Sequence, residues 1–219
     1  MVRNPLVCSI EFRGTCLSQP DLSSYDNSWY SPGRSSAVRA LWFFIGSPIV
    51  RCQLLPFSSV RRFILRCFGA KLERGVVLKP GVRVKYPWLL SIGKHSWIGE
   101  DVWIDNLVEV SIGDNACLSQ RAYLCTGNHD WSDQFFGLQV LPIVLGDGSW
   151  VGAGALICPG VTIGQSGAAA AGSVVTKPIP AFEIHSGNPA HFVRRRIFRQ
   201  NAHCSPDCVL ECCEPNPSN

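Results

Sequence analysis

The sequence predicts a parallel β-helix, because aliphatic residues recur every six positions between residues 72 and 175. Three short series, at 72–84, 92–104 and 112–124, precede a longer one. The longer series is unbroken and comprises Leu145, Val151, Ile157, Ile163, Ala169 and Val175. A period of six fits no α-helix, whose apolar stripe recurs at three and four residues. It fits an all-β solenoid, in which each repeat buries its apolar face by stacking on its neighbours.

Departures from the period predict where the chain leaves the solenoid. Three hexads would form a triangular coil of about 18 residues, with coils about 4.8 Å apart. Two steps are eight residues long, after Val84 and after Ile104, and an insertion of two preserves the in–out alternation of a strand. The step from Leu124 to Leu145 spans 21 residues. We therefore expect a loop at 127–142, and loops on rigid scaffolds are where function concentrates.

Changes in composition divide the chain into segments. Serine, aspartate, tyrosine and proline are frequent before residue 38, and a helical pattern with many arginines follows. We expect a leader and extended arm at 1–37, a helical segment at 38–69, the β-helix at 70–177, a cap with a short helix over Phe192–Phe198 at 178–199, and a disordered tail at 200–219. The tail contains Cys204, Cys208, Cys212 and Cys213 without the paired C-x-x-C spacing of a metal site.

The helical segment allows two interpretations. On a helix over 58–68, Val60, Phe63, Ile64 and Cys67 share one face, and the arginines at 61, 62 and 66 lie off it. The segment could pack on the base of the solenoid. It could also lie as a basic amphipathic element on an anionic membrane surface. No stretch reaches the roughly 18 apolar residues that a membrane span requires.

Composition excludes several classes of protein. Hydrophobic residues make up 46% of the chain, so global disorder is excluded. A net charge of +4 is too mild for a dedicated nucleic-acid binder, which carries a dense basic face. The N-terminus lacks the apolar core of a secretory signal. We therefore expect a cytoplasmic protein with reduced thiols.

His129 stands at the start of the predicted loop, in the sequence T-G-N-H-D. Histidine is the side chain best suited to proton transfer near neutral pH. Stacking of coils places Asp105 and Asn106 beside Cys125 and Thr126, at the root of the same loop. From spacing alone, a surface histidine that caps a turn is the simpler interpretation, because no base–nucleophile pair stands out.

Several motifs resemble those of the hexapeptide-repeat acetyltransferases. They are I-G-x-x at 92–95, 98–101 and 112–115, T-G-N-H-D at 126–130, A-G-S-V-V-T-K at 171–177 and G-N-P-A at 187–190. L-R-C-F-G-A-K at 65–71 and W-I-G-E-D-V-W at 97–103 are typical of sugar O-acetyltransferases of the colanic acid biosynthesis group. The resemblance covers about residues 21–197. The hexads are common to the whole family. The motifs T-G-N-H-D, A-G-S-V-V-T-K and G-N-P-A are more specific.

This resemblance implies a left-handed β-helix, a homotrimer, and acetyl-CoA in a groove between two subunits. It implies that His129 is the catalytic base and that Trp150 lines the acceptor side. The positions that it implies for coenzyme A are Ala153, Ala171, Thr176 and Lys177, with Arg194 at the phosphates. His191 stands where relatives have an arginine, and Gly99 where the galactoside enzymes have an acceptor-positioning asparagine. We therefore expect Asp105 or Asn106 to contact the acceptor.

The expected function is O-acetyl transfer from acetyl-CoA to a saccharide hydroxyl in exopolysaccharide synthesis, with no metal and no nucleic-acid partner. The acceptor is a free or a lipid-linked saccharide, and in the second case the helical segment would hold the enzyme at the inner membrane face. An acyltransferase for serine or another small acceptor would share the fold and the coenzyme. A non-catalytic β-helix scaffold would bind a metal through several histidines, but the predicted solenoid contains only His95 and His129.

Overall fold

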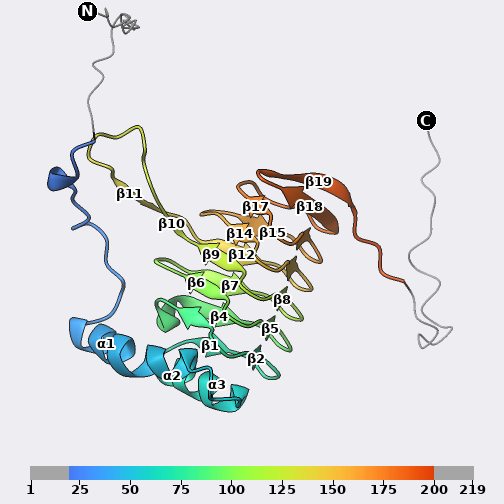
Figure 1. Ribbon diagram of the computed structural model, residues 1–219, viewed down its shortest axis with the longest axis horizontal. Helices are drawn as coiled ribbons and strands as arrows, with labels where there is room; N and C mark the ends of the chain where they lie inside the picture. Colours follow the sequence, from blue (N-terminus) through green and yellow to red (C-terminus); the bar gives the residue numbers. More distant parts are fainter. Residues whose placement is uncertain (1–19, 200–219) are drawn as a thin grey trace, which may run out of the picture.

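The computed structural model describes residues 20–199 and confirms the solenoid (Figure 1). Short parallel strands stack into three faces, and a helical segment covers one end. In stacking order, the first face contains β1 (Lys71–Leu72), β4 (Leu90–Ile92), β7 (Val110–Ile112), β12 (Ile143–Leu145) and β15 (Thr162–Ile163). The second face contains β2 (Val77–Leu78), β5 (Trp97–Ile98), β8 (Cys117–Leu118), β13 (Trp150–Val151), β16 (Ala168–Ala169), β18 (Glu183–Gly187) and β19 (Ala190–Arg195). The third face contains β3 (Arg83–Val84), β6 (Trp103–Asp105), β9 (Tyr123–Cys125), β14 (Leu156–Ile157) and β17 (Val174–Val175).

The core is built from the aliphatic residue that begins each hexad. On the second face, Leu78, Ile98, Leu118 and Val151 occupy equivalent positions on successive coils and are buried. Burial of such a side chain contributes about 1.5–3 kcal/mol to folding. The next position is small because the coils approach closely there. A Cβ added to Gly152 would lie 2.5 Å from the backbone nitrogen of Ala171 on the next coil.

The predicted interruptions lie at corners between faces. A 3₁₀ helix, η3 (Pro87–Leu89), fills the first eight-residue step, and a turn at 106–109 fills the second. The 21-residue step contains an antiparallel hairpin of β10 (Gly127–His129) and β11 (Leu138–Val140). This hairpin projects from the corner between the third and first faces (Figure 1). The expected loop at 127–142 is therefore an ordered element.

The helical segment packs against the first coils. It comprises α1 (Ser36–Leu41), a π-helix η2 (Trp42–Gly46), α2 (Ser47–Arg51) and α3 (Ser58–Cys67). Trp42 is buried and donates from Nε1 to the carbonyl oxygen of Val84, at 3.3 Å. The Ser58 hydroxyl accepts from the backbone N–H of Leu78, at 2.9 Å. These contacts bear out the interpretation in which the helices cover the base of the solenoid.

The buried face of α3 differs from our expectation. Arg61 and Leu65 are fully buried, whereas Phe63 is exposed. The Arg61 guanidinium donates to the backbone carbonyl of Val50, in the last turn of α2, and to those of Cys52 and Leu55, in the segment that follows. A buried guanidinium requires such acceptors, and these three carbonyls supply them for Nε and Nη2. The helix therefore rotates so that the arginine faces inward and Phe63 faces outward.

The short helix expected over Phe192–Phe198 is also wrong. Residues 190–195 form β19, which pairs antiparallel with β18, and β18 pairs parallel with β16. The last coil leaves the edge of β16 unpaired, and a hairpin that continues the sheet satisfies those backbone groups. Phe192 and Val193 favour an extended strand over a helix. The cysteines of the tail lie outside the described residues. Within 20–199, no helix has the length and apolar character needed to cross a bilayer.

Candidate active site

His129 occupies the last position of β10 and is oriented by the opposite side of the hairpin. Its Nδ1 lies 2.8 Å from the carbonyl oxygen of Phe136. A carbonyl oxygen only accepts, so Nδ1 carries the proton and the lone pair of the neutral ring is on Nε2. The Phe136 ring stacks on the imidazole with centroids 4.3 Å apart and planes 12° apart. The hairpin thus fixes both the tautomer and the plane of His129.

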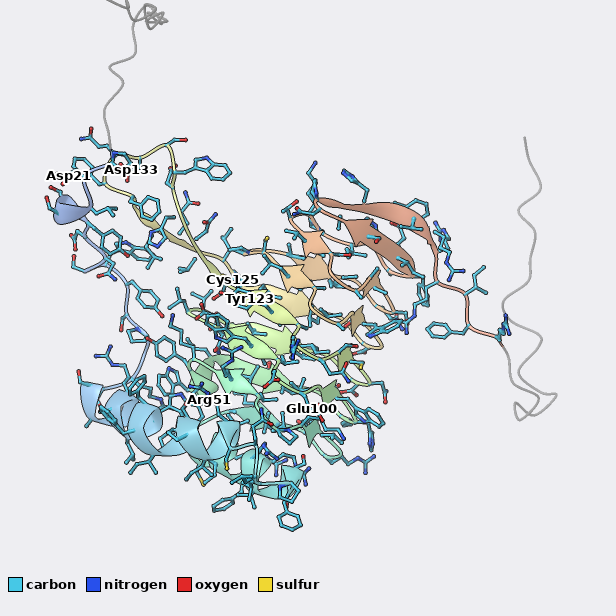
Figure 2. All side chains as sticks on the ribbon, in the orientation of Figure 1. Asp21, Arg51, Glu100, Tyr123, Cys125 and Asp133 are labelled. Atoms are coloured by element: carbon cyan, nitrogen blue, oxygen red, sulfur yellow. The ribbon has the colours of Figure 1, made fainter. Side chains whose placement is uncertain are left out.

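The extended arm that precedes α1 contacts the same histidine. The Tyr25 ring meets the imidazole edge-on, with centroids 5.7 Å apart. The arm is tied to the hairpin by the backbone N–H of Asp21, which donates to the Gln134 carbonyl at 2.7 Å. Figure 2 shows Asp21 beside Asp133 in this region. Segments about a hundred residues apart in the chain therefore enclose His129.

Asp105 and Asn106 lie at the root of the hairpin, as stacking predicted, because Asp105 pairs with Cys125 in the third face. Their side chains differ in availability. Asp105 forms an ion pair with Lys85 at 2.9 Å and accepts from the Tyr123 hydroxyl at 3.3 Å. Asn106 is fully buried, and its amide exchanges two hydrogen bonds with the Tyr86 backbone. Asn106 therefore supports the corner, which leaves Asp105 as the acceptor candidate of the pair.

A groove of about 490 Å³ lies along the second face (the second-face groove). Its lining is mainly small and apolar, with two guanidinium groups at its edge: it comprises Ser119, Gln120, Trp150, Gly152, Ala153, Ala168–Ala171, Ile184, Arg194 and Arg196. Four residues predicted from the resemblance, Trp150, Ala153, Ala171 and Arg194, are brought together here. The Trp150 ring is oriented by its Nε1, which donates to the Ser119 hydroxyl at 2.9 Å.

Other predicted residues lie elsewhere. Thr176 and Lys177 are exposed on the turn that follows β17, outside the lining of the second-face groove. His129 is also absent from this lining. Figure 1 shows the β10–β11 hairpin on the side of the solenoid away from β18 and β19. Within one chain, the histidine and the groove are therefore separate.

Comparisons with known proteins identify the family of this chain. A protein of Escherichia coli K12 named "Putative colanic acid biosynthesis acetyltransferase" is 37% identical over 177 residues, which cover 81% of this chain and 97% of that protein. The chain belongs to the hexapeptide-repeat acetyltransferase family. No family model matches it.

Solved structures of the family share the fold. A maltose O-acetyltransferase from Clostridium difficile 630 is 26% identical with a TM-score of 0.65, covering 74% of this chain and 89% of its own. A hexapeptide-repeat acetyltransferase from Vibrio cholerae, solved with acetyl coenzyme A, has a TM-score of 0.67 at 23% identity. The match covers 76% of this chain and 92% of that chain. The solenoid is a left-handed parallel β-helix, as the resemblance implied.

Sequence reasoning missed two groups that touch these site residues. Tyr25 and Phe136 carry no motif, and only their contacts with His129 single them out. Arg196 donates to the carbonyl of Gly148 at 2.9 Å, and its guanidinium lies 5.9 Å from the centre of the Trp150 ring. Desolvation by burial lowers the pKa of Arg196. The run of arginines at 194–196 predicts positive charge for phosphate groups, and both Arg194 and Arg196 line the groove.

Proposed function

We propose that this acetyltransferase moves the acetyl group of acetyl-CoA to a saccharide hydroxyl, with His129 as general base. The observation that carries the proposal is the hydrogen bond from Nδ1 to the Phe136 carbonyl, because it leaves Nε2 free to accept a proton. His129 is half-buried on a projecting hairpin, where a hydroxyl group can reach it. The family membership supplies the reaction class.

In this mechanism, Nε2 of His129 removes the proton of the sugar hydroxyl as its oxygen attacks the thioester carbonyl. A carbon–oxygen bond forms, the carbon–sulfur bond breaks, and the imidazolium returns its proton to the departing thiolate. A base so positioned contributes about 10²–10⁴-fold to the rate. Phe136 and Tyr25 hold the imidazole plane, so that the transfer does not require the ring to reorient.

The second-face groove would hold coenzyme A, and we call it the coenzyme groove from here on. Ala153 and Ala171 leave the backbone accessible to an extended pantetheine arm, and the exposed Arg194 supplies positive charge for phosphate groups. Thr176 and Lys177, beyond the groove, would contact the remainder of the coenzyme. Trp150 would close the acceptor side of the groove. Among residues 20–199, no group of three or more histidine, cysteine, aspartate or glutamate side chains could hold a metal ion.

The assembly that we propose is a homotrimer with the active sites between subunits. The separation of His129 from the coenzyme groove supports it, since neither part of the site is complete without the other. A cyclic arrangement would bring the hairpin of one subunit to the groove of the next. The corner from which the hairpin projects leaves it unobstructed by the solenoid (Figure 1).

The acceptor that we propose is a saccharide of an exopolysaccharide repeat, carried on a lipid at the membrane. The relatives are named for colanic acid biosynthesis and for maltose. The outer side of the helical segment supports a membrane surface as the partner. Its apolar side chains are exposed to an unusual degree, including Phe43, Phe44 at 73%, Ile45, Leu54 at 93%, Phe57 and Phe63.

The experiment that tests the function is a coenzyme A release assay over a panel of mono- and oligosaccharides, with serine as a non-sugar acceptor. Acetylation of a saccharide that requires acetyl-CoA is the expected result. Acetylation of serine with no saccharide turned over would contradict the acceptor class. Flotation with liposomes tests the membrane contact separately: we expect binding to anionic vesicles, which Phe43→Ser together with Phe44→Ser abolishes, and failure of the wild type to float would contradict it.

A further inference from the structure

A second groove, also of about 490 Å³, lies between the helical segment and the third face of the solenoid (the helix–face groove). Nothing in the mechanism above uses it. Three separate segments form it, from α1 to α2, from β3 to Tyr86, and in β6. Its lining comprises Ser36, Arg39, Trp42, Phe43, Ser47, Arg51, Arg83, Val84, Lys85, Tyr86, Trp103 and Asp105.

The helix–face groove has an excess of positive charge. It is lined by four basic side chains and one carboxylate. Asp105 pairs with Lys85, at 2.9 Å. In the described part of the chain, Arg39, Arg51 and Arg83 have no carboxylate within 4.0 Å. The Nε of Arg39 is buried without a hydrogen-bond acceptor in the structure of residues 20–199. Buried donors of this kind are almost always satisfied, so the groove has the character of an anion site.

Aromatic rings continue from these charges along the third face. The Arg83 guanidinium lies 4.8 Å above the centre of the Trp103 ring. Trp103 stacks on Tyr123 of the next coil, with centroids 4.5 Å apart and planes 12° apart. Because Arg83, Trp103 and Tyr123 are in register on successive strands, the guanidinium and the Tyr123 ring cover opposite faces of Trp103 and fix this wall of the groove. Beyond the arginines, the Asp105 carboxylate lines the groove and can accept hydrogen bonds from the hydroxyl groups of a sugar.

The two ends of the helix–face groove differ in their surroundings. At one end are Phe43 and Arg51, on the helical segment whose outer side exposes apolar residues. At the other end Asp105 lies beside Cys125, which leads into the hairpin with His129. Figure 2 shows Arg51 near the helices and Tyr123 and Cys125 near the base of the hairpin. An acceptor in the groove would thus have its anionic end near the helices and its sugar toward the histidine.

We infer that the helix–face groove binds the phosphate ester of a phosphorylated saccharide, the acceptor of the reaction. The inference rests on the proposed function, because it gives the charge of the acceptor that His129 would deprotonate. The phosphate would be held by Arg39, Arg51 and Arg83, and the sugar would extend past the edge of Trp103 toward Asp105. The same chemistry occurs in prenyl-linked and in nucleotide-linked saccharides.

Isothermal titration with glucose 1-phosphate tests this site without any acetyl transfer. We expect binding by the wild type, and none by glucose at the same concentration. Arg83→Gln and Arg51→Gln should each weaken it by about tenfold or more, because each removes a charged hydrogen bond to the phosphate. Arg83→Lys should restore part of the affinity. Arg74→Gln, at an exposed arginine outside the groove, is the matched control and should bind normally. Thermal unfolding shows whether each variant is folded.

Three results would overturn the inference: equal binding of glucose and glucose 1-phosphate, equal affinity in Arg83→Gln and Arg74→Gln, or displacement of glucose 1-phosphate by coenzyme A. The His129→Ala variant should retain the binding, which distinguishes failure of this site from failure of the proposed base. Farnesyl diphosphate and UDP-glucose are titrated in the same way as two further ligands. Tighter binding of either supports the site, and the tighter one identifies the carrier.

Discussion

Phe136 holds His129 in two ways at once: its carbonyl oxygen lies 2.8 Å from Nδ1, and its ring stacks on the imidazole at 4.3 Å. The backbone contact sets the tautomer, and the side chain sets the plane. Substitution of Phe136 alters only the second, since every residue keeps the carbonyl. The two contributions can therefore be separated by mutation.

Phe136→Ala should lower kcat by about tenfold while KM for acetyl-CoA stays within about twofold, because an aromatic stack is worth about 0.5–1.5 kcal/mol. Phe136→Tyr should restore most of the rate. Steady-state coenzyme A release measures both constants. A large rise in KM for acetyl-CoA with an unchanged kcat would place Phe136 at the coenzyme instead.

Ala171→Trp should fill part of the coenzyme groove and raise KM for acetyl-CoA by at least about tenfold, because overpacking excludes the ligand. The comparison variant is Ala181→Trp, at an exposed position that does not line this groove. It should leave KM unchanged. If the two variants have the same KM, coenzyme A does not occupy the groove.

Mixed oligomers test whether the active site is shared between subunits. At an acetyl-CoA concentration well below the raised KM of Ala171→Trp, His129→Ala subunits and Ala171→Trp subunits should each have little activity as homotrimers. Co-expressed, they should form mixed trimers in which about one site in three combines an intact hairpin with an intact groove. Activity is measured on hetero-oligomers purified through two affinity tags. Absence of any recovery would show that both parts of the site belong to one subunit.

Arg61→Ala should destabilise the fold by about 3 kcal/mol, because it leaves three backbone carbonyls without their donor. Chemical denaturation gives the free energy of unfolding. Arg74→Ala, at an exposed arginine of the adjoining turn, should change it by less than about 0.5 kcal/mol. A small effect of Arg61→Ala would mean that the helical segment adds little to stability.

The six-residue period predicted the positions that every coil repeats. It did not predict structure that depends on a single tertiary contact. Leu78, Ile98 and Leu118 are foreseeable because every coil buries the same position, and Gly152 because every coil passes its neighbour closely there. Arg61 is not foreseeable, since its acceptors come from the end of α2 and the irregular segment after it. The helix expected at 192–198 failed because the unpaired edge of β16, a tertiary feature, decides its conformation.

The candidate site was likewise predictable only in part. His129 was found because a single long step breaks the hexads and because T-G-N-H-D matches a family motif. The helix–face groove was not foreseen, because Arg39, Arg83 and Asp105 meet only when the helices fold back on the third face. Asn106 was expected to contact the acceptor because of its neighbour Asp105, but adjacent strand residues point to opposite faces, and its side chain is inside.

The most direct test of the central claim is the rate of acetyl transfer by His129→Gln, measured at saturating acetyl-CoA with the saccharide found in the acceptor panel. Isothermal titration with coenzyme A shows that the groove is intact, and the thermal midpoint shows that the fold is intact. We predict that kcat falls by about 10²–10⁴-fold while the affinity for coenzyme A stays within about twofold. Transfer at the wild-type rate by this folded, coenzyme-binding variant would contradict the assignment of His129 as the base.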